Sequence, residues 1–170
     1  NRTALTSVTI PAGMEEFGVG VFSYCQSLET VIVEEGVESL GESMFYNCTS
    51  LGTVRLPENS LTSIDQYAFA GCSALEAIDI PSSVTYFGPG AFYQTKWLDE
   101  KRQERSDHLV IVNDVVVDGY LCTGDIVVPE GVKAIAATAF TNCIQAEKSG
   151  AAITSIELPS SVTSIGTAAF

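Results

Sequence analysis

The chain has 170 residues, of which 21 are Asp or Glu and 8 are Lys or Arg, so its formal net charge is −13. This charge excludes a nucleic-acid-binding protein, because such proteins use Lys and Arg to neutralise phosphates, and it argues equally against an anionic membrane surface. Hydrophobic residues make up 46% of the chain. No run approaches the roughly 20 apolar residues of a membrane-spanning helix, and the sequence contains no signal peptide.

The first three segments repeat one pattern, and they begin at Leu5, Leu28 and Leu51. They read LTSVTIPAGMEEFGVGVFSYCQS, LETVIVEEGVESLGESMFYNCTS and LGTVRLPENSLTSIDQYAFAGCSA, and their lengths are equal to within one position. A period this short predicts a solenoid in which each repeat forms one coil and neighbouring coils stack around a continuous core.

Each repeat starts with an apolar pair such as Val8 and Ile10, whose two-residue spacing puts both side chains on the inward side of a strand. Pro11 follows, and a proline ends a strand because it lacks the N–H group that the ladder requires. Val37 and Leu40 of the second repeat represent a second inward pair on the return limb. Strand and return limb are therefore both expected to contribute to the core.

A phenylalanine column recurs near the end of each repeat, at Phe22, Phe45, Phe69, Phe92, Phe140 and Phe170. Neighbouring coils are expected to lie about 4.8 Å apart, as paired strands do, so these rings should stack inside the solenoid. A glycine column precedes it, at Gly18, Gly41, Gly88 and Gly166. Because glycine adopts positive φ values without steric cost, this second column predicts a bend with positive φ.

The pattern extends over most of the chain, with repeats that begin near residues 5, 28, 51, 75, 123 and 153. Residues 96–122 form an insert, and Ile144–Ala152 form a smaller one that is expected to be a loop. We interpret residues 1–170 as one domain of about six coils of ~23 residues, β-rich with short helical or 3-10 turns. Neither end resembles a polar capping repeat, which favours a fragment of a longer protein.

The first insert begins with Lys96–Asp107, whose charged helix formers predict a short helix. Two apolar strands, Leu109–Val112 and Val115–Val117, then flank the turn-forming pair Asn113-Asp114. The favoured interpretation is an enlarged coil whose hairpin joins the ladder. The alternative is a projecting recognition element, with contacts from Trp97, Lys101, Arg102 and Arg105.

Four of the five cysteines share one repeat slot: Cys25, Cys48, Cys72 and Cys143. Cysteines fixed in a slot are expected to be small buried apolar side chains rather than reactive groups. Adjacent coils could bring Cys25 and Cys48 within disulfide range. The odd total, and the Thr95 that replaces cysteine in the same slot, argue against an obligatory disulfide framework.

The sequence offers little catalytic chemistry. His108 is the only histidine, and no second His or Cys lies at metal-ligand spacing from it, so we predict no metal site. There is no nucleophile elbow, phosphate-binding loop or zinc-protease motif, and we predict no cofactor. A Cys122–His108 pair stays open as an alternative, although nothing in the sequence orients it.

The candidate binding surface is the outer face of the strands. In each strand, the position between the two inward residues points outward. The inward positions stay apolar in every repeat, whereas the outward residue changes from repeat to repeat: Thr9, Ile32, Arg55, Asp79, Val127 and Glu157. A second outward column precedes them and is rich in small and hydroxyl side chains: Ser7, Thr30, Thr53, Ala77, Asp125 and Ser155. Variable residues on a fixed scaffold are typical of a recognition surface, and drift at exposed positions is the alternative explanation.

Taken together, the slots read L-x-x-[VI]-x-[IVL]-P-x-x-V-x-x-[IFL]-G-x-x-A-F-x-x-C. This pattern resembles the signature of the BspA-type leucine-rich repeat family. The resemblance implies a curved right-handed superhelix with a short parallel strand per coil on one face. It also implies a bacterial or protist protein of the secreted or cell-surface kind, and well-known members are adhesins that bind host matrix proteins or other cells.

We therefore predict a non-enzymatic protein–protein interaction or adhesion module of an extracellular or cell-surface bacterial protein. Its partner would be a host matrix protein, another cell-surface protein or a glycan. The alternative is a rigid spacer that displays other domains, although at ~4.8 Å per coil six coils span only about 29 Å. An enzyme built around His108 is the least favoured hypothesis.

Overall fold

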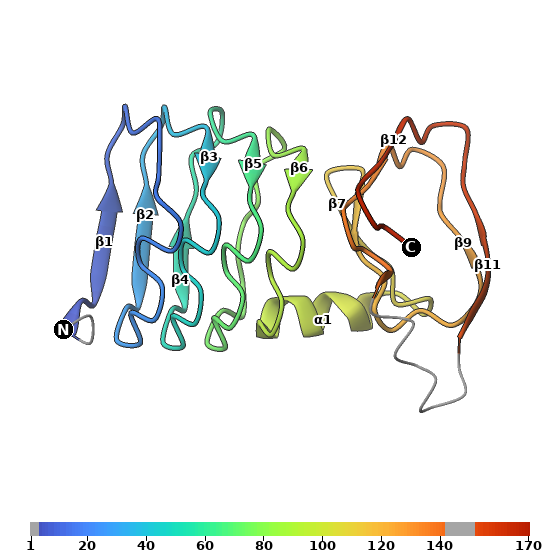
Figure 1. Ribbon diagram of the computed structural model, residues 1–170, viewed down its shortest axis with the longest axis horizontal. Coiled ribbons are helices and arrows are strands. Elements are labelled where there is room, and N and C mark those ends of the chain that lie inside the picture. The colour runs from blue at the N-terminus through green and yellow to red at the C-terminus, as the bar shows by residue number, and fades with distance from the viewer. Residues whose placement is uncertain (1–3, 142–151) are drawn as a thin grey trace. The chain divides into compact units, whose positions relative to one another are not determined.

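The structure is a computed structural model that describes residues 4–141 and 152–170. The chain forms two compact units, Asn1–Glu100 and Lys101–Phe170. In the first unit, regular coils follow one another from blue to green in Figure 1. In the second unit, the coils are larger and include a hairpin.

The first unit contains the predicted strand in three of its four repeats. Strands β1 (Ser7–Ile10), β2 (Thr30–Val33) and β4 (Thr53–Arg55) form a parallel sheet in the order β1-β2-β4. The register aligns Val8 with Val31 and Val31 with Val54, so each step along the sheet equals one sequence repeat. Residues 76–81 of the fourth repeat are described but form no strand.

A second parallel sheet lies on the return limbs, which corrects the expectation of strands on one face only. It consists of β3 (Ser39–Leu40), β5 (Ser63–Ile64) and β6 (Tyr86–Phe87), again in the order of the repeats. Leu40, Ile64 and Phe87 are aligned by the register and buried. The predicted second inward pair thus ends in a short strand of its own.

The remaining side of each coil is made of hydrogen-bonded turns that carry the phenylalanine column. Phe22, Phe45, Phe69 and Phe92 stack with ring centroids 5.6, 5.4 and 5.7 Å apart and nearly parallel planes. The backbone N–H of Phe45 donates to the carbonyl of Ala68, and that of Phe69 to the carbonyl of Ala91, both at 2.8 Å. The predicted aromatic stack is confirmed, and backbone bonds between coils hold its spacing.

The prediction of positive φ at the glycine column is wrong. The positive φ angles occur further along each turn, as at Gly20 and Tyr24. A Cβ atom at Gly88 would overlap the backbone N of Gln66 and lie 2.6 Å from the carbonyl carbon of Asp65. At Gly88, and likewise at Gly166, glycine is therefore required because two coils approach closely, rather than for its φ angle.

The insert starts with a helix, α1 (Lys96–Glu104), which confirms the helical prediction. Strands β7 (Val110–Val112) and β8 (Val115–Asp118) then form an antiparallel hairpin, close to the predicted strand limits. Asn113 and Asp114 have φ angles of 48° and 62°. Positive φ at both central residues is what a two-residue type I′ hairpin turn requires.

The hairpin joins the ladder of the second unit, as the enlarged-coil interpretation predicted. Its sheet has the order β12-β10-β8-β7, and β8 pairs in parallel with β10 (Ala134–Ile135). Strand β12 (Ser164–Ile165) follows in parallel with β10. Strands β9 (Gly124–Val127) and β11 (Ile153–Glu157) form a separate parallel pair.

The core of the second unit repeats that of the first on a smaller scale. Phe140 and Phe170 stack with centroids 5.3 Å apart, and the hairpin contributes the fully buried Val116 to the same apolar cluster as Ile135. The smaller insert and Cys143 fall almost entirely within residues 142–151, which lie outside the described residues. The loop expected there is therefore still a prediction.

Candidate functional site

The predicted outward column of the first unit forms a continuous row. The register places Thr9 beside Ile32, and Ile32 beside Arg55. Thr9 and Arg55 are exposed and Ile32 is half-buried. Asp79 is exposed as well, but it lies in the stretch without a strand. The sheet thus brings together a hydroxyl, an aliphatic and a guanidinium group on one rigid face.

The hydroxyl-rich column runs parallel to this row. The register aligns Ser7, Thr30 and Thr53, of which the first and last are exposed. Small side chains here leave the neighbouring Ile32 and Arg55 accessible from one side. Together the two columns make a mixed polar and apolar surface, which is the composition of most transient protein interfaces.

The outward positions of the second unit have a different character. Val127 and Glu157 are directly opposite each other on β9 and β11, and both are exposed. Nearby, the hydroxyls of Thr154 and Ser155 donate to Asp125 Oδ1 at 2.7 and 2.6 Å. Ser155 contributes most to holding the pKa of the Asp125 carboxyl below its ordinary value, followed by Thr154. This carboxylate is therefore charged and engaged within the sheet.

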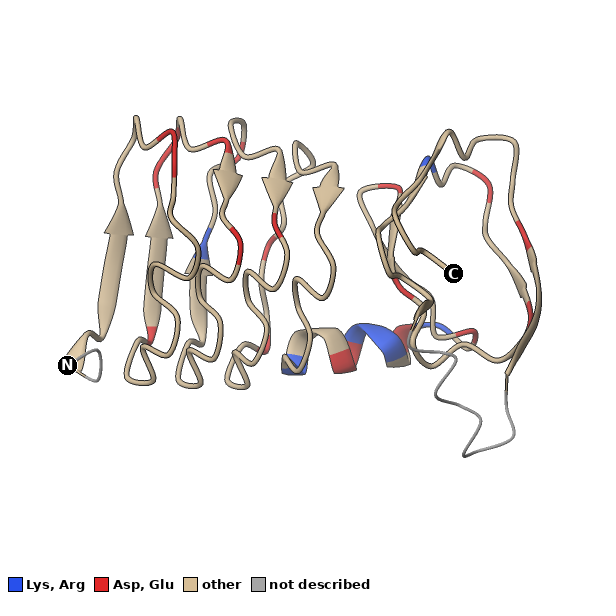
Figure 2. Cartoon of the chain, viewed as in Figure 1, with Lys and Arg blue, Asp and Glu red and all other residues tan. Residues whose placement is uncertain are grey.

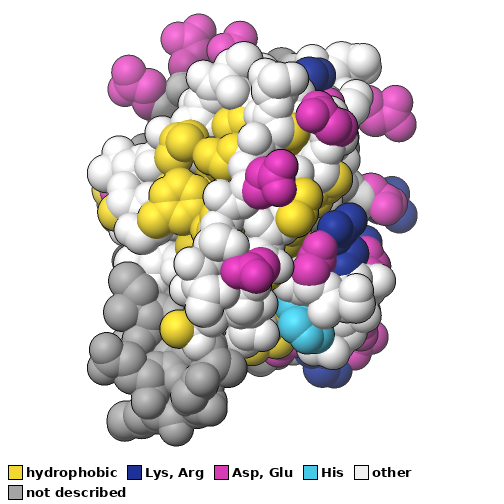
Figure 3. All heavy atoms as spheres, turned by 90° about the vertical axis from the view of Figure 1, so that its right-hand side faces the viewer, with side chains coloured by type: hydrophobic (Ala, Val, Ile, Leu, Met, Phe, Trp, Pro, Cys, Tyr) yellow, Lys and Arg dark blue, Asp and Glu magenta, His cyan; other side chains and the backbone are white. Residues whose placement is uncertain are grey.

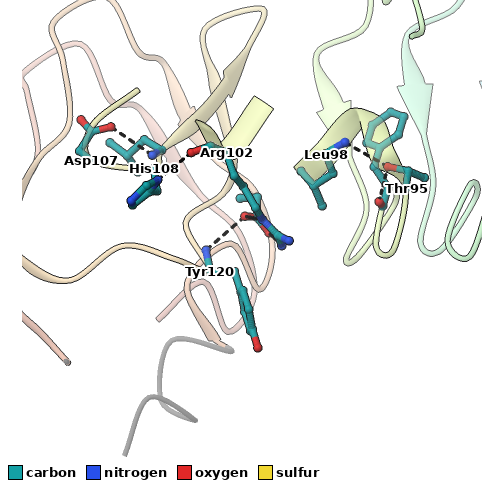
Figure 4. A network of polar contacts seen from close by, with 9 residues as sticks. Thr95, Leu98, Arg102, Asp107, His108 and Tyr120 are labelled. Carbon is teal, nitrogen blue, oxygen red and sulfur yellow. Dashed lines mark hydrogen bonds and ion pairs between the residues drawn. The ribbon is translucent and has the colours of Figure 1, made fainter. Parts of the chain in front are cut away.

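The alternative interpretation, in which Trp97 is a contact residue of a projecting element, is wrong. Its side chain is only 5% exposed, and its ring centroid lies 4.5 Å from that of Phe92. Thr95, which replaces cysteine in its slot, accepts a hydrogen bond from the backbone N–H of Leu98 at 3.2 Å (Figure 4). Thr95 is therefore the N-cap of α1, and the first turn of the helix buries Trp97 in the core.

Arg102 is also not positioned as an exposed contact residue. Its Nε and one terminal nitrogen donate to the two carboxylate oxygens of Asp118 at 2.8 and 2.9 Å. The Arg102 side chain is only 9% exposed, and its guanidinium lies 5.0 Å from the ring centre of Tyr120. This bidentate ion pair ties α1 to β8, so it has a structural role within the second unit.

Lys101 and Arg105 are more accessible but paired with acids. Lys101 Nζ lies 2.8 Å from Glu104, and the Arg105 guanidinium makes two bonds to Asp107 at 2.9 and 2.6 Å. The latter hydrogen bonds lower the pKa of Asp107. Figure 2 shows basic and acidic residues alternating along α1. The insert is therefore not a basic patch.

His108 has a structural environment in the second unit. Its Nδ1 donates a hydrogen bond to the carbonyl oxygen of Arg102 at 2.8 Å (Figure 4), because a carbonyl oxygen can only accept. Cys122 is buried in the apolar cluster. Within residues 4–141 and 152–170, no group of three His, Cys, Asp or Glu side chains could hold a metal ion. The geometry gives no support to the Cys122–His108 alternative.

Two cysteines of the repeat slot donate hydrogen bonds within the core. The Sγ atoms of Cys48 and Cys72 each donate to the carbonyl oxygen of a phenylalanine one coil back, at 3.1 Å. Burial raises the pKa of the Cys48 thiol to about 12 and that of Cys72 further. Cys25, Cys48 and Cys72 are buried and form no disulfide. The thiols of Cys48 and Cys72 are therefore protonated at neutral pH and unsuited to nucleophilic chemistry.

A row of tyrosines on the turn side of the first unit is not evident from the sequence. Tyr24 and Tyr46 meet edge to face with centroids 5.5 Å apart, and Tyr46 and Tyr67 do so at 6.4 Å. Tyr93 lies in the corresponding turn of the fourth repeat. Only Tyr46 and Tyr93 share a slot of the repeat, so the alignment does not show the four tyrosines as one column. Their common signal is an extra aromatic residue within two positions of the phenylalanine slot.

The second unit also presents an apolar face, which Figure 3 shows turned toward the viewer. Ile165 and Phe170 are each 51% exposed, and Ile156, Leu158 and Val162 are partly buried against the core beneath. This face lies where the described ladder ends at β11 and β12. It differs from the strand columns, which mix polar and apolar groups.

Comparison with known proteins agrees with the repeat geometry. A family model for the BspA type leucine rich repeat region (6 copies) matches residues 1–105 and 120–170. No curated protein matches the chain. In the part of the chain that the structure describes, no helix has the length and apolar character needed to cross a membrane.

Two solved structures share the fold. A leucine-rich repeat protein from Bacteroides ovatus ATCC 8483 is 23% identical with a TM-score of 0.52, and the match covers 95% of this chain and 36% of that one. The T. pallidum leucine rich repeat protein is 24% identical with a TM-score of 0.56, covering 98% of this chain and 74% of that one. This chain thus spans about a third of the length of the B. ovatus protein (36%).

The strand registers, the stacked phenylalanines and the buried cysteine slot all follow the repeat that the family model describes. That model covers both units and leaves out only residues 106–119, which lie in the insert. The chain belongs to the BspA-type leucine-rich repeat family.

Proposed function

We propose that this chain is a non-enzymatic protein-binding module of a secreted or cell-surface bacterial protein, and that it serves in adhesion. Bacterial leucine-rich repeat proteins are generally protein-interaction modules. The thiols and the single histidine are engaged in structural contacts, which favours binding over catalysis. The partner class that fits is a host matrix protein or another surface protein.

The observation that carries this proposal is the in-register row of Thr9, Ile32 and Arg55 on one parallel sheet. The backbone of paired strands is held by the ladder, so little backbone conformational entropy is lost when a partner binds. Ile32 provides an apolar centre, and Arg55 provides a multivalent donor of the kind enriched in binding hot spots. The hydroxyl column beside them can supply the polar rim of an interface.

Charge supports the choice of Arg55 as an anchor. Only three basic residues occur in residues 1–100, namely Arg2, Arg55 and Lys96, against 13 acidic ones. Lys96 forms an ion pair with Glu76 at 2.6 Å, whereas Arg55 lies exposed on the sheet. An acidic or hydrogen-bond-accepting group of a partner would therefore be attracted to Arg55, the one basic residue among the described residues 4–95 of this acidic unit.

The proposal is tested by screening immobilised matrix and surface proteins for binding, then measuring the variants Ile32→Ala and Arg55→Ala by surface plasmon resonance. We expect each to weaken binding about tenfold or more, since hot-spot truncations cost roughly 2 kcal/mol or more. Lys133→Ala is the matched control, because it removes an exposed basic residue of the second unit. Binding that is unchanged in both sheet variants would exclude the row as the contact surface.

We further propose that residues 1–170 behave as one domain, a right-handed superhelix of about six coils. A repeat protein whose interfaces are continuous unfolds in one cooperative transition. Urea unfolding followed by the fluorescence of Trp97 and by far-ultraviolet circular dichroism should therefore give coincident curves. Two separated transitions would mean that the two compact units are independent domains.

A further inference from the structure

The tyrosine row of the first unit is a second candidate surface, distinct from the strand columns. It consists of Tyr24, Tyr46, Tyr67 and Tyr93. Their rings meet at 5.5 and 6.4 Å over the first three repeats. A Cβ atom added at Gly90 would lie 2.6 Å from the Tyr67 ring and 3.7 Å from the Cβ of Tyr93, so Gly90 lets the row continue into the fourth repeat.

Core packing does not explain these aromatic residues. Tyr24, Tyr67 and Tyr93 are 54%, 38% and 45% exposed, and the core beneath them is filled by the phenylalanine stack. Tyr24 and Tyr67 moreover have φ angles of 59° and 54°. A bulky residue is uncommon in this left-handed region, and the equivalent turn positions of other repeats include Gly20, Gly71 and Gly90. Large exposed side chains at strained positions indicate a functional surface.

The surroundings of the row are polar but almost uncharged. Residues 17–28 and 88–95 contain no charged side chain, and residues 41–51 and 65–75 contain one each, although 17% of the whole chain is charged. Of those two carboxylates, that of Asp65 accepts a bond from the backbone of Gln66 at 2.8 Å. Amide side chains replace charges here: Gln26, Asn47, Gln66 and Gln94.

We propose that the tyrosine row binds an uncharged polysaccharide chain. Phenol rings present apolar faces on which the C–H faces of sugar rings stack, while their hydroxyls and the neighbouring amides can bond to sugar hydroxyls. The near absence of charge fits a neutral glycan, and the lack of Lys and Arg disfavours nucleic acid and acidic glycans. A row that repeats once per coil suits a polymer better than a single sugar.

The test is isothermal titration calorimetry with cellohexaose, laminarihexaose and mannohexaose. We expect saturable binding of at least one of them, with affinity that rises from the disaccharide to the tetrasaccharide as more rings of the row are covered. The double variant Tyr46→Ala/Tyr67→Ala should lower that affinity about tenfold or more. Tyr46→Phe, which keeps the ring, should retain most of it.

The matched control is Tyr86→Ala, because Tyr86 is 50% exposed but belongs to β6. Tyr86→Ala should leave the affinity for the oligosaccharide within about twofold of the parent value. The double variant Ile32→Ala/Arg55→Ala should do the same, and this result would separate glycan binding by the tyrosine row from protein binding by the strand face. Circular dichroism melting curves establish that each variant is folded. The proposal is overturned if no neutral hexasaccharide binds, if Tyr86→Ala weakens binding as much as the row variant, or if the row variant instead abolishes binding to a protein.

Discussion

The two units use the same inward slots but differ in what lies between them. In the first, aligned positions of paired strands recur at a nearly constant interval, and phenylalanines stack from coil to coil. In the second unit, the register aligns Val115 with Ala134 and Ala134 with Ser164. The stretch of chain from Ala134 to Ser164 is nevertheless much longer than the stretch from Val115 to Ala134. This difference shows that the slots define the solenoid and that the connecting segments can lengthen without disturbing it.

The units also differ in how electrostatic interactions are used. Ion pairs of the first unit, such as Lys96–Glu76, are exposed. The second unit has exposed pairs as well, such as Lys133–Asp114, but it also buries the Arg102–Asp118 pair, which fixes the helix against the hairpin. An enlarged coil therefore needs specific polar contacts where a regular coil relies on repeated apolar packing.

The largest expected effect is on the aromatic stack of the first unit. Phe69→Ala should lower the free energy of unfolding by about 3–5 kcal/mol, because it leaves a cavity between two stacked rings. In the second unit, Phe170→Ala should cost less than about 1 kcal/mol, since that ring is half exposed. Urea denaturation measures both, and equal losses would contradict the difference between the two stacks.

A somewhat smaller loss is expected for the buried ion pair. Arg102→Ala should destabilise the protein by about 3 kcal/mol, since Asp118 would be left without its charge partner. Lys96→Ala should cost much less, because its pair with Glu76 is exposed to solvent. Thermal and urea unfolding of both variants provide the check. A loss for Arg102→Ala no larger than that for Lys96→Ala would mean that the pair does not anchor the helix.

Close approach of coils predicts a contrast between two glycines of the first unit. Gly88→Ala should cost about 1–3 kcal/mol, because the new methyl group overlaps the backbone of the preceding coil. At Gly18 the nearest atom to an added Cβ is a Val21 methyl at 3.9 Å. Gly18→Ala should therefore stay within about 0.5 kcal/mol of the parent. Similar losses at both sites would contradict close approach as the reason for glycine at Gly88.

The N-cap of α1 predicts a loss of about 1 kcal/mol for Thr95→Ala in the free energy of unfolding. Thr95→Ser keeps the hydroxyl that accepts from Leu98 and should retain most of the stability. Far-ultraviolet circular dichroism with urea titration distinguishes the two. If the two variants are equally destabilised, the packing of the threonine methyl group matters more than its hydroxyl.

The smallest effect concerns the thiols at high pH. Burial raises the pKa of Cys48 to about 12 in the folded protein. Because this pKa is higher than that of the same thiol in the unfolded chain, deprotonation favours unfolding. The thiol's contribution to the free energy of unfolding is therefore complete below about pH 8.5 and is lost as the pH rises toward the folded pKa. As the pH rises from 8 to 11, the urea concentration at the midpoint of unfolding should fall less steeply for Cys48→Ala than for the parent protein. In denaturant, thiol titration should find all five cysteines reactive.

Much of the scaffold could be predicted because its signals repeat. The phenylalanine stack, the proline-limited strands and the hairpin around Asn113-Asp114 all follow from local pattern. The glycine column was misassigned because a sequence shows that glycine is needed, but not whether φ or close approach requires it. Only the coordinates reveal the backbone of Gln66 next to Gly88.

The outward row of Thr9, Ile32 and Arg55 could be predicted from the period of the strand, whereas the environment of the insert depends on contacts that no repeat slot encodes. Trp97 and Arg102 lie in a charged segment that is typical of an exposed helix. Their burial depends on Phe92 and on Asp118, which the sequence does not mark as partners. The tyrosine row is not evident from the sequence because its members are spread over three slots and meet only once the coils stack.

The most direct test of the central claim is hydroxyl-radical footprinting of the chain with a captured partner protein. We expect oxidation of Ile32 and other outward residues of β1, β2 and β4 to fall when the partner is bound, while Tyr86 and the α1 residues stay equally reactive. Protection confined to the insert, or to the apolar end around Ile165 and Phe170, would contradict the assignment of the outer strand face as the protein-binding surface.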